Sequence, residues 1–370
     1  MSRKEYDKIL KKYYGYDGLK DLQYEIIDNI INGTDTIALL PTSYGKSICF
    51  QLPHIITKKN VIVVSPLISL MEDQMQDLKS RKIGVICLNS HNKNKTQDLD
   101  DVYEGESKII YTTPEYLIAN KKFIDKLVLL DNLALIAIDE CHCISSWGHD
   151  FRNAYQKLSF LKEHAPDIPI LALSATATDR VVEGIKANLN LVNPEIVKHS
   201  MDRKNLYIEI CEKTDNVLDE KIVPLIEKNE DGRILIYCKT TADTDKVAEA
   251  LKKYGYKCES YHAKKKDSER TEIQKQFTNG DINIIVSTIA FGMGINIPDI
   301  RILIHYNCSN DIESYVQEIG RAGRDNKTSR CYMFYSERDF MLNYLFLDGI
   351  KDFVAKKQKE VDVDFLKKYV

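Results

Sequence analysis

The stretch Thr36–Ser47, with the sequence TIALLPTSYGKS, decides the fold of the first half of the chain. It begins with the apolar run Thr36–Leu40, passes through a turn that contains Gly45, and reaches Lys46-Ser47, where a helix-period segment begins. Backbone N–H groups at such a strand-to-helix turn, together with the helix N-terminus, present partial positive charge to phosphate oxygens. The stretch therefore predicts a phosphate-binding loop that follows a strand of a parallel sheet.

The loop matches the general G-x-x-x-x-G-K-[ST] pattern imperfectly. Leu40 stands at the position of the first Gly, and Tyr44 occupies a place with little room for a side chain. Lys46 is expected to reach the β and γ phosphates, and the Ser47 hydroxyl is expected to hold Mg²⁺. An ordinary Gly-Lys-Ser turn is the alternative interpretation.

A pair of acids strengthens the first interpretation. The apolar run Leu135–Ile138 leads directly into Asp139 and Glu140. Carboxylates at the end of a buried strand are costly unless they have a cation. Asp139 is expected to contact Mg²⁺ through water, and Glu140 to orient and deprotonate the attacking water. With Lys46, the pair predicts hydrolysis of ATP or GTP.

Short β-branched runs alternate with helix-period segments along most of the chain, which is typical of parallel α/β folds. In the first series we expect strands at Thr36–Leu40, Val61–Ser65, Val85–Asn89, Lys108–Thr112, Leu133–Asp139 and Ile168–Ser174. In the second we expect Ile234–Cys238, Cys258–Tyr261, Ile284–Ser287, Arg301–Tyr306 and Cys331–Tyr335. The pattern predicts two tandem parallel-sheet domains over residues 1–203 and 204–336, and 370 residues suit that number. Residues 337–370 are expected to form a short helical tail, of which Lys351–Val370 is interpreted as a solvated helix.

Composition limits the classes of protein. With 44% hydrophobic and 29% charged residues, an extended disordered chain is excluded. The formal net charge of −3 gives no basic excess, so any nucleic-acid track must be local. The nine cysteines form no pair of CxxC knuckles, so no structural zinc is expected and the thiols are interpreted as free, in an intracellular, non-secreted protein. Apolar runs are of strand length, far below the roughly 20 residues of a membrane span, so no membrane partner is expected.

Together these residues resemble the RecQ-type DNA helicases of helicase superfamily 2, from about Tyr13 to Asp339. The resemblance implies two RecA-like domains with an ATP site in the cleft between them, and ATP and Mg²⁺ as cofactors. Upstream of the loop, Tyr16, Lys20 and Gln23 are similar to the family's adenine-recognition motif, in which Arg is usual at the position of Lys20. In the family's loop, glycines are usual at the positions of Ser43 and Tyr44. The implied nucleotide-binding set is Tyr16, Lys20, Gln23, Thr42, Ser43, Tyr44, Gly45, Lys46 and Ser47.

Further motifs imply contacts with DNA and coupling to hydrolysis. The loop after the acid pair holds the chain's single Trp and resembles the aromatic-rich loop that separates the RecQ group from related RNA helicases. Aromatic faces stack on unpaired bases, and Arg adds a phosphate or cation–π contact. The implied residues are Trp147, His149, Phe151 and Arg152 in this loop, Ser65, Pro66, Thr113, Ser174 and Thr176 in the first domain, and Thr240, His262, Thr288 and Gly292 in the second. The alternatives are helix caps at the strand ends and core anchors for Trp147 and Phe151.

The segment Gln317–Asp325 places two arginines on either side of small residues. By resemblance, Arg324 is the arginine finger that neutralises charge on the γ-phosphate, Arg321 is a second phosphate contact, and Gln317 helps to close the site. As isolated residues, such arginines would more often form surface ion pairs.

The function implied is ATP-dependent unwinding of duplex DNA with 3′ to 5′ movement, on single-stranded and forked DNA, by a monomer that acts in repair or recombination. The alternatives are an RNA helicase of the same superfamily, or a nucleic-acid-binding protein with impaired turnover. RecQ proteins often continue into a zinc-binding module and a winged helix. Because no cysteine follows Cys331, the expectation is a catalytic core without these modules, which is either a core-only enzyme or a truncated chain.

Overall fold

The computed structural model describes residues 1–370 except 43, 67, 90, 91, 93, 145–151, 176, 201, 230, 293–296, 348–352 and 370. Contacts divide the chain into two compact units, Met1–Met201 and Asp202–Val370. Across the described residues, no helix is both long enough and apolar enough to cross a bilayer.

The first unit is built on a seven-stranded sheet of order β3-β4-β2-β5-β6-β1-β7, and its strands pair in parallel. The strands are β1 Thr36–Leu39, β2 Asn60–Val64, β3 Val85–Leu88, β4 Ile109–Thr112, β5 Leu133–Ile138, β6 Ile170–Ser174 and β7 Glu195–Lys198. The helices are α1 Arg3–Tyr14, α2 Asp21–Ile31, α3 Lys46–Thr57, α4 Ile68–Ser80, α5 Lys95–Tyr103, α6 Pro114–Ala119, α7 Lys122–Leu129, α8 Asn153–Gln156, α9 Leu161–His164 and α10 Asp179–Asn188. Two 3-10 turns cover Cys141–Ile144 and Lys157–Phe160.

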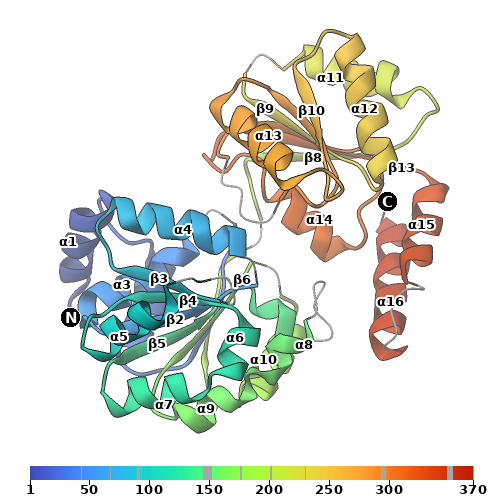
Figure 1. The fold of residues 1–370 in the computed structure, drawn as a ribbon. Coiled ribbons are helices and arrows are strands. Elements are labelled where there is room, and N and C mark those ends of the chain that lie inside the picture. The colour runs from blue at the N-terminus through green and yellow to red at the C-terminus, as the bar shows by residue number, and fades with distance from the viewer. Residues whose placement is uncertain are drawn as a thin grey trace. The chain divides into compact units, whose positions relative to one another are not determined.

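Helices cover both faces of this sheet (Figure 1). Because side chains alternate along a strand, Ile37 and Leu39 enter one core while Ala38 and Leu40 enter the other. The first core packs residues of α6, α7 and α10 against the sheet, and the second packs residues of α1, α2 and α3. Burial on both faces explains why the central strands read as continuous apolar runs.

The second unit contains a six-stranded sheet of order β10-β11-β9-β12-β13-β8, again with parallel pairing. Its strands are β8 Leu206–Glu212, β9 Arg233–Tyr237, β10 Cys258–Tyr261, β11 Ile284–Ser287, β12 Ile300–His305 and β13 Ser329–Tyr335. Its helices are α11 Val223–Glu227, α12 Thr241–Lys253, α13 Asp267–Asn279, α14 Ile312–Ile319, α15 Glu337–Leu347 and α16 Phe353–Tyr369, and a π-helical turn covers Leu218–Ile222. Residues of α11 and α12 pack on one face of the sheet, and those of α13 to α16 contribute to the core on the other.

The structure confirms the predicted α/β fold of two parallel-sheet units. The predicted strands are all present, and their bounds differ from the predictions by at most two residues. Two strands were missed, β7 and β8. Both lie at a sheet edge, and Val197 is the only buried residue of the two strands. An edge strand with one covered side lacks the continuous apolar run on which the predictions depended.

The interpretation of the C-terminal segment as a solvated helix was wrong. Helices α15 and α16 lie side by side (Figure 1), and Val363 and Leu366 of α16 are 2% and 3% exposed. They join Phe340 and Leu347 of α15 in a core of the second unit. The lysines that suggested solvation occupy the other positions of an amphipathic helix.

We predict that Val363→Ala destabilises the second unit by about 1–3 kcal/mol, because it removes buried methyl groups. The matched control is Val361→Ala, since Val361 lies on the same helix but is 54% exposed. It should change the free energy of unfolding by less than about 0.5 kcal/mol. Urea denaturation followed by circular dichroism measures both. Equal destabilisation by the two variants would contradict the packing of α16.

Candidate functional site

The predicted nucleotide residues of the first unit gather at one edge of its sheet. The register pairs Leu39 with Ser174 and Val64 with both Thr112 and Ile138, so these strands end level with one another. The residues that follow each strand therefore share the carboxyl edge, where open α/β sheets bind ligands.

The phosphate loop leaves β1 at this edge and ends at the N-terminus of α3. Leu40 N donates to Ser174 O at 3.0 Å, and Tyr44 N donates to Pro41 O at 3.2 Å, which closes the turn. Gly45 has a φ of +93° and precedes Lys46, the first residue of α3. This left-handed conformation favours glycine, and it turns the chain so that the helix N-terminus faces the loop. Thr42 and Ser47 are half-buried in the same turn, and Ser43 lies outside the described residues.

Gln23 ties the phosphate loop to α2. Its Nε2 donates to Tyr44 O and to Gly45 O, both at 3.1 Å, and its Oε1 accepts from Lys20 N at 3.0 Å. A hydrogen bond donated by Gln23 Nε2 to adenine would therefore replace one of these bonds, whereas Gln23 Oε1 can still accept a second bond. Tyr16 is 56% exposed just after α1, so its ring is accessible for the predicted stacking.

Two of the departures from the family pattern, Lys20 and Tyr44, contact each other. Lys20 Nζ donates to Tyr44 O at 2.9 Å and lies 4.4 Å from the centre of the Tyr44 ring, a cation–π contact. The other neighbour of that ring is His199, at a centroid separation of 4.7 Å. Tyr44 thus packs against side chains that lie outside the loop, which explains how a tyrosine is accommodated in place of glycine.

The acid pair stands opposite the loop lysine. Lys46 Nζ is 3.8 Å from Glu140 Oε1, and Glu140 N donates to Asp139 Oδ1 at 3.1 Å. Burial, and then the charge of Glu140, raise the pKa of Asp139 to about 6. Glu140 has a φ of +49°, unusual for a residue with a side chain, and such conformations cluster at functional sites.

His142 links the acids to the end of β6 and was missed in the sequence. Its Nδ1 lies 3.0 Å from Ser174 Oγ and 3.3 Å from Glu140 Oε2, and the ring is 2% exposed. Ser174, predicted as a coupling residue, is therefore part of the acid cluster. The available signal was the position of His142, two residues after Glu140 at the same strand end.

The donor set suits the predicted Mg²⁺. The Ser47 hydroxyl and the Asp139 carboxylate both offer oxygen ligands, which Mg²⁺ prefers, and a buried carboxylate with a raised pKa is stabilised by a cation. Within the described part of the chain, no group of three or more His, Cys, Asp or Glu side chains is arranged to hold a metal. The fit therefore rests on two protein ligands, with the remaining positions left to water and phosphate.

A second set of predicted residues lies along the same edge and borders a hollow. Arg152 Nη1 donates to Pro66 O at 3.0 Å. Ser65 Oγ is buried and has no hydrogen-bond partner among the described residues. A hollow of about 640 Å³ is lined by Glu115, Ile118, Arg152, Asn153, Ala154 and Lys157. The lining is mixed, and it includes two basic residues, Arg152 and Lys157, beside the acidic residue Glu115.

Other predicted contacts have more ordinary roles or fall outside the structure. Thr113 caps α6 by accepting a hydrogen bond from Tyr116 N, and Thr240 caps α12 by accepting one from Asp243 N. These hydroxyls confirm the cap interpretation, while their contact with DNA stays a prediction. Trp147, His149, Phe151 and Thr176 lie outside the described residues.

The second unit carries its own predicted residues at the carboxyl edge of its sheet. His262 follows β10, with its Nε2 3.1 Å from Asp245 Oδ1. Thr288 follows β11, and its N donates to Tyr261 O at 3.2 Å. Arg321 Nη1 donates to Gly292 O, and a Cβ on Gly292 would lie 2.6 Å from Arg321 Nη2. Gly292 is therefore required for the close approach of this guanidinium.

The predicted catalytic arginines lie in the arginine loop, residues 320–327, which follows α14. Burial, and then the charge of Arg321, lower the pKa of Arg324 to about 10, so it remains a cation at neutral pH. Gln317 is half-buried on the last turn of α14. Closely spaced guanidinium groups repel each other and favour an anion between them.

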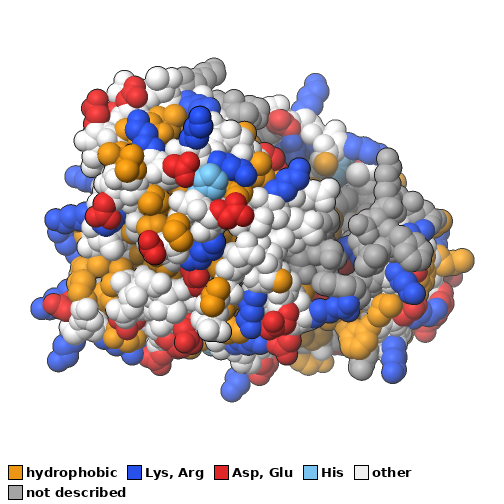
Figure 2. Space-filling view, turned by 90° about the horizontal axis from the view of Figure 1, so that it is seen from below, with side chains coloured by type: hydrophobic (Ala, Val, Ile, Leu, Met, Phe, Trp, Pro, Cys, Tyr) orange, Lys and Arg blue, Asp and Glu red, His pale blue; other side chains and the backbone are white. Residues whose placement is uncertain are grey.

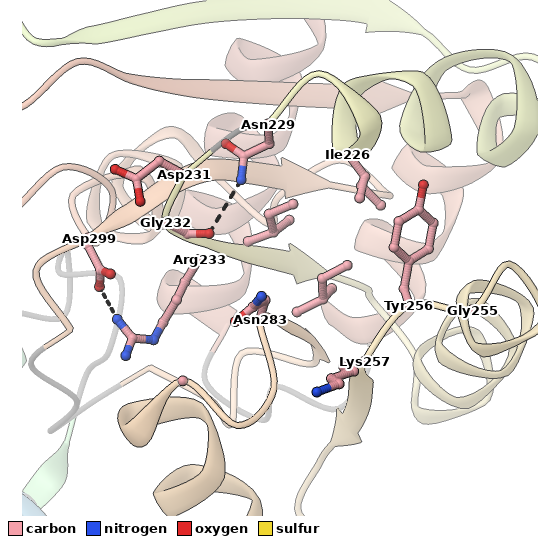
Figure 3. Close-up of a pocket in the computed structure, with 13 residues that line it drawn as sticks. Ile226, Asn229, Asp231, Gly232, Arg233, Gly255, Tyr256, Lys257, Asn283 and Asp299 are labelled. Atoms are coloured by element: carbon pink, nitrogen blue, oxygen red, sulfur yellow. Dashed lines mark hydrogen bonds and ion pairs between the residues drawn. The ribbon is translucent and has the colours of Figure 1, made fainter.

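The hollow drawn in Figure 3 lies at the opposite edge of this sheet. It measures about 510 Å³ and is lined by residues at the amino ends of β9, β10, β11 and β12. None of the predicted site residues borders it.

On the face drawn in Figure 2, positive and negative side chains are interspersed, in keeping with the net charge of −3.

Two family models match the chain: DEAD/DEAH box helicase over residues 20–185, and Helicase conserved C-terminal domain over residues 213–326. The chain is 45% identical to a putative ATP-dependent RNA helicase of Acanthamoeba polyphaga mimivirus, over 99% of this chain and 67% of that protein. It is 41% identical to the bifunctional 3′-5′ exonuclease/ATP-dependent helicase WRN of Mus musculus, over 93% and 25%. It is 37% identical to the ATP-dependent DNA helicase RecQ of Haemophilus influenzae, over 90% and 53%. The chain thus spans only a quarter to two thirds of the length of these relatives.

Solved structures show the same fold at low identity. Dbp5 of S. cerevisiae bound to RNA and ADP BeF3 is 18% identical, with a TM-score of 0.70 over 99% of both chains. The helicase Lhr of Mycobacterium smegmatis bound to ssDNA and AMP-PNP is 17% identical, with a TM-score of 0.69 over 94% of this chain and 49% of that chain.

We predict that Gly45→Ala lowers the affinity for a fluorescent ADP analogue by at least about tenfold, or about 1.4 kcal/mol. The new Cβ would lie 2.6 Å from Gln23 Nε2, so Gln23 would have to release the loop carbonyls. The matched control is Gly33→Ala, which carries the same left-handed strain with a φ of +82° but has no atom within 4 Å of the added Cβ. Both variants should lose about 1–2 kcal/mol of stability. Retained affinity in Gly45→Ala would contradict the role of Gln23.

Proposed function

The chain belongs to the RecQ-type helicases of superfamily 2, a family of ATP-dependent helicases, and from this premise we propose that it couples ATP hydrolysis to 3′ to 5′ movement along single-stranded DNA and so unwinds duplexes. The observation that carries the proposal is the contact between Lys46 and Glu140 at the N-terminus of α3, 3.8 Å apart. It brings a phosphate-binding cation and a water-activating acid to one place.

The two residues suit sequential roles in hydrolysis. Before nucleotide binds, Lys46 and Glu140 partly neutralise each other. The β and γ phosphates compete for the ammonium group, which would leave the Glu140 carboxylate available to orient and deprotonate water. Ser47 and Asp139 would hold Mg²⁺, which when bound neutralises charge on the phosphate oxygens. Exposed Tyr16 would stack on the base, with Gln23 contacting its edge.

The arginine loop is proposed to complete the ATPase. Arg324 would neutralise the charge that develops on the γ-phosphate, with Arg321 as a second contact and Gln317 closing the site. ATP would bridge the two units and its hydrolysis would release them, because only the ATP-bound state brings the arginines to the γ-phosphate. Burial, and then repulsion from Arg321, lower the pKa of Arg324, and a bound anion would offset both effects, which supports this role.

His142 supplies a physical route from chemistry to movement. It contacts both Glu140 and Ser174. A change in the charge or position of Glu140 would therefore shift the His142 ring and its contact with Ser174 at the end of β6. We propose that this route, together with the loop that contains Trp147, couples hydrolysis to the grip on DNA. Ser65 and Arg152 are proposed contacts to the nucleic-acid backbone, because the buried hydroxyl of Ser65 has no partner among the described residues and the Arg152 guanidinium bonds the carbonyl of the next residue, Pro66.

Two alternatives differ in their support. RNA unwinding is a second candidate, because the relative with 45% identity is described as a putative RNA helicase. Impaired turnover is less well supported, because the Tyr44 ring packs against Lys20 and His199, outside the phosphate loop. We propose a monomer that acts inside the cell, on single-stranded or forked DNA.

Strand displacement distinguishes these functions. We predict ATP-dependent unwinding of a short DNA duplex with a 3′ single-stranded tail, and at least about tenfold slower unwinding of 5′-tailed DNA or 3′-tailed RNA. Lys46→Ala should abolish all unwinding, because the β and γ phosphates lose their cation. Equal or faster unwinding of the RNA duplex would favour the second candidate. Faster unwinding of the 5′-tailed duplex would contradict the proposed direction of movement. Full unwinding activity of Lys46→Ala would contradict the proposed nucleotide site.

A further inference from the structure

Arg203 and Asn205 open the second unit and contact the arginine loop. Asp202 is the first residue of that unit, so both side chains lie within four residues of the point at which the chain passes between units. Arg203 Nη2 donates to Ala322 O at 3.1 Å and to Gly323 O at 2.9 Å. Asn205 Nδ2 donates to Gly323 O at 3.0 Å and to Lys327 O at 2.9 Å.

The two side chains also support each other. Arg203 Nε donates to Asn205 Oδ1 at 3.3 Å, which leaves the amide nitrogen of Asn205 turned toward the loop. Together they bind three carbonyls of the turn that contains Arg324 and follows Arg321. The other side of the turn is held by backbone bonds from Gly323 N to Ile300 O and from Asp325 N to Pro298 O.

This turn needs external support for two reasons. Gly323 has a φ of +55°, and a Cβ there would lie 2.6 Å from Asn205 Nδ2, so the close contact depends on glycine. The guanidinium groups of Arg321 and Arg324 also repel each other, and the charge of Arg203 adds to the effect on Arg324. The hydrogen bonds from Arg203 to two loop carbonyls offset part of the cost of placing a third cation here.

We propose that Arg203 and Asn205 are positioning residues, which hold the arginine loop so that Arg321 and Arg324 keep the orientation that hydrolysis requires. This inference rests on the proposed function, because the role of Arg203 and Asn205 matters for hydrolysis only if Arg321 and Arg324 contact the γ-phosphate. Since Arg203 and Asn205 lie close to the start of the unit, these two residues anchor the beginning of the second unit to the arginine loop.

Arg233 provides a matched control. It is an arginine of the same unit that also donates to two backbone carbonyls, Phe277 O at 2.6 Å and Thr278 O at 2.7 Å, both in the last turn of α13. It pairs with Asp299 and lies at the hollow of Figure 3, at the amino edge of the sheet. Among the described residues, its side-chain hydrogen bonds go to Asp299, Phe277 and Thr278 and not to the arginine loop. Substitution of Arg233 therefore reports what the loss of a structural arginine does to the unit.

The experiment compares Arg203→Gln, Asn205→Asp and Arg233→Gln in the full chain. Asn205→Asp keeps the shape but replaces a donor by an acceptor that faces two carbonyls. Hydrogen–deuterium exchange of peptides that cover residues 317–330 should rise in the first two variants and stay unchanged in Arg233→Gln. With single-stranded DNA and ATP, kcat should fall by at least about tenfold in the first two variants, while affinity for a fluorescent ADP analogue changes by less than about twofold. Arg203→Lys should restore only part of kcat, because an ammonium group lacks the planar fork.

The outcomes separate the inference from the proposed function. Unchanged exchange of residues 317–330 in Arg203→Gln and Asn205→Asp would overturn the positioning role, whatever the activity. Raised exchange with wild-type kcat, or an equal fall of kcat in Arg233→Gln, would overturn its importance for hydrolysis. If the wild-type chain itself hydrolyses no ATP, the proposed function fails and the assigned purpose fails with it, while the exchange data still decide whether the residues hold the loop.

Discussion

A lysine ammonium and a glutamate carboxylate, 3.8 Å apart at the carboxyl edge of the first sheet, form the contact on which the account depends. Parallel strands make this contact possible, because they bring the end of β1 and the end of β5 to one edge although Lys46 and Glu140 are far apart in sequence. In the proposed mechanism, the two charges balance before nucleotide binds, and the phosphates of ATP would take the place of Glu140 at the lysine. Nucleotide binding would then also free the acid to activate water.

The contact is set in a rigid frame. Gln23 holds the loop carbonyls from α2, and Glu140, in a left-handed conformation, contacts Lys46 and His142 through its carboxylate. His142 contacts both this carboxylate and Ser174, so it links Glu140 to the end of the neighbouring strand, β6. A net charge of −3 is compatible with such a protein, since its proposed grip on nucleic acid is a narrow track of hydroxyls, helix ends and a few arginines.

The sequence predicted the parts of the fold whose physical signal is strong. Strands buried on both faces read as apolar runs, and Asp139 and Glu140 were conspicuous because they follow such a run. The sequence did not reveal the edge strands β7 and β8 or the buried face of α16, because their burial depends on what packs beside them. The contacts of His142 and Arg203 were missed for the same reason, since each side chain bonds a residue that is distant in sequence. The accommodation of Tyr44 likewise required knowing that Lys20 and His199 flank it.

The central claim is that the arginines of the second unit act on the nucleotide held by the first. The most direct measurement is steady-state ATP hydrolysis with saturating single-stranded DNA by Arg324→Ala, with Arg330→Ala, an exposed arginine of β13, as the control. The account predicts that Arg324→Ala lowers kcat by about 10³-fold while affinity for ADP stays within about twofold, and that the control retains wild-type kcat. Wild-type kcat in Arg324→Ala would contradict the claim.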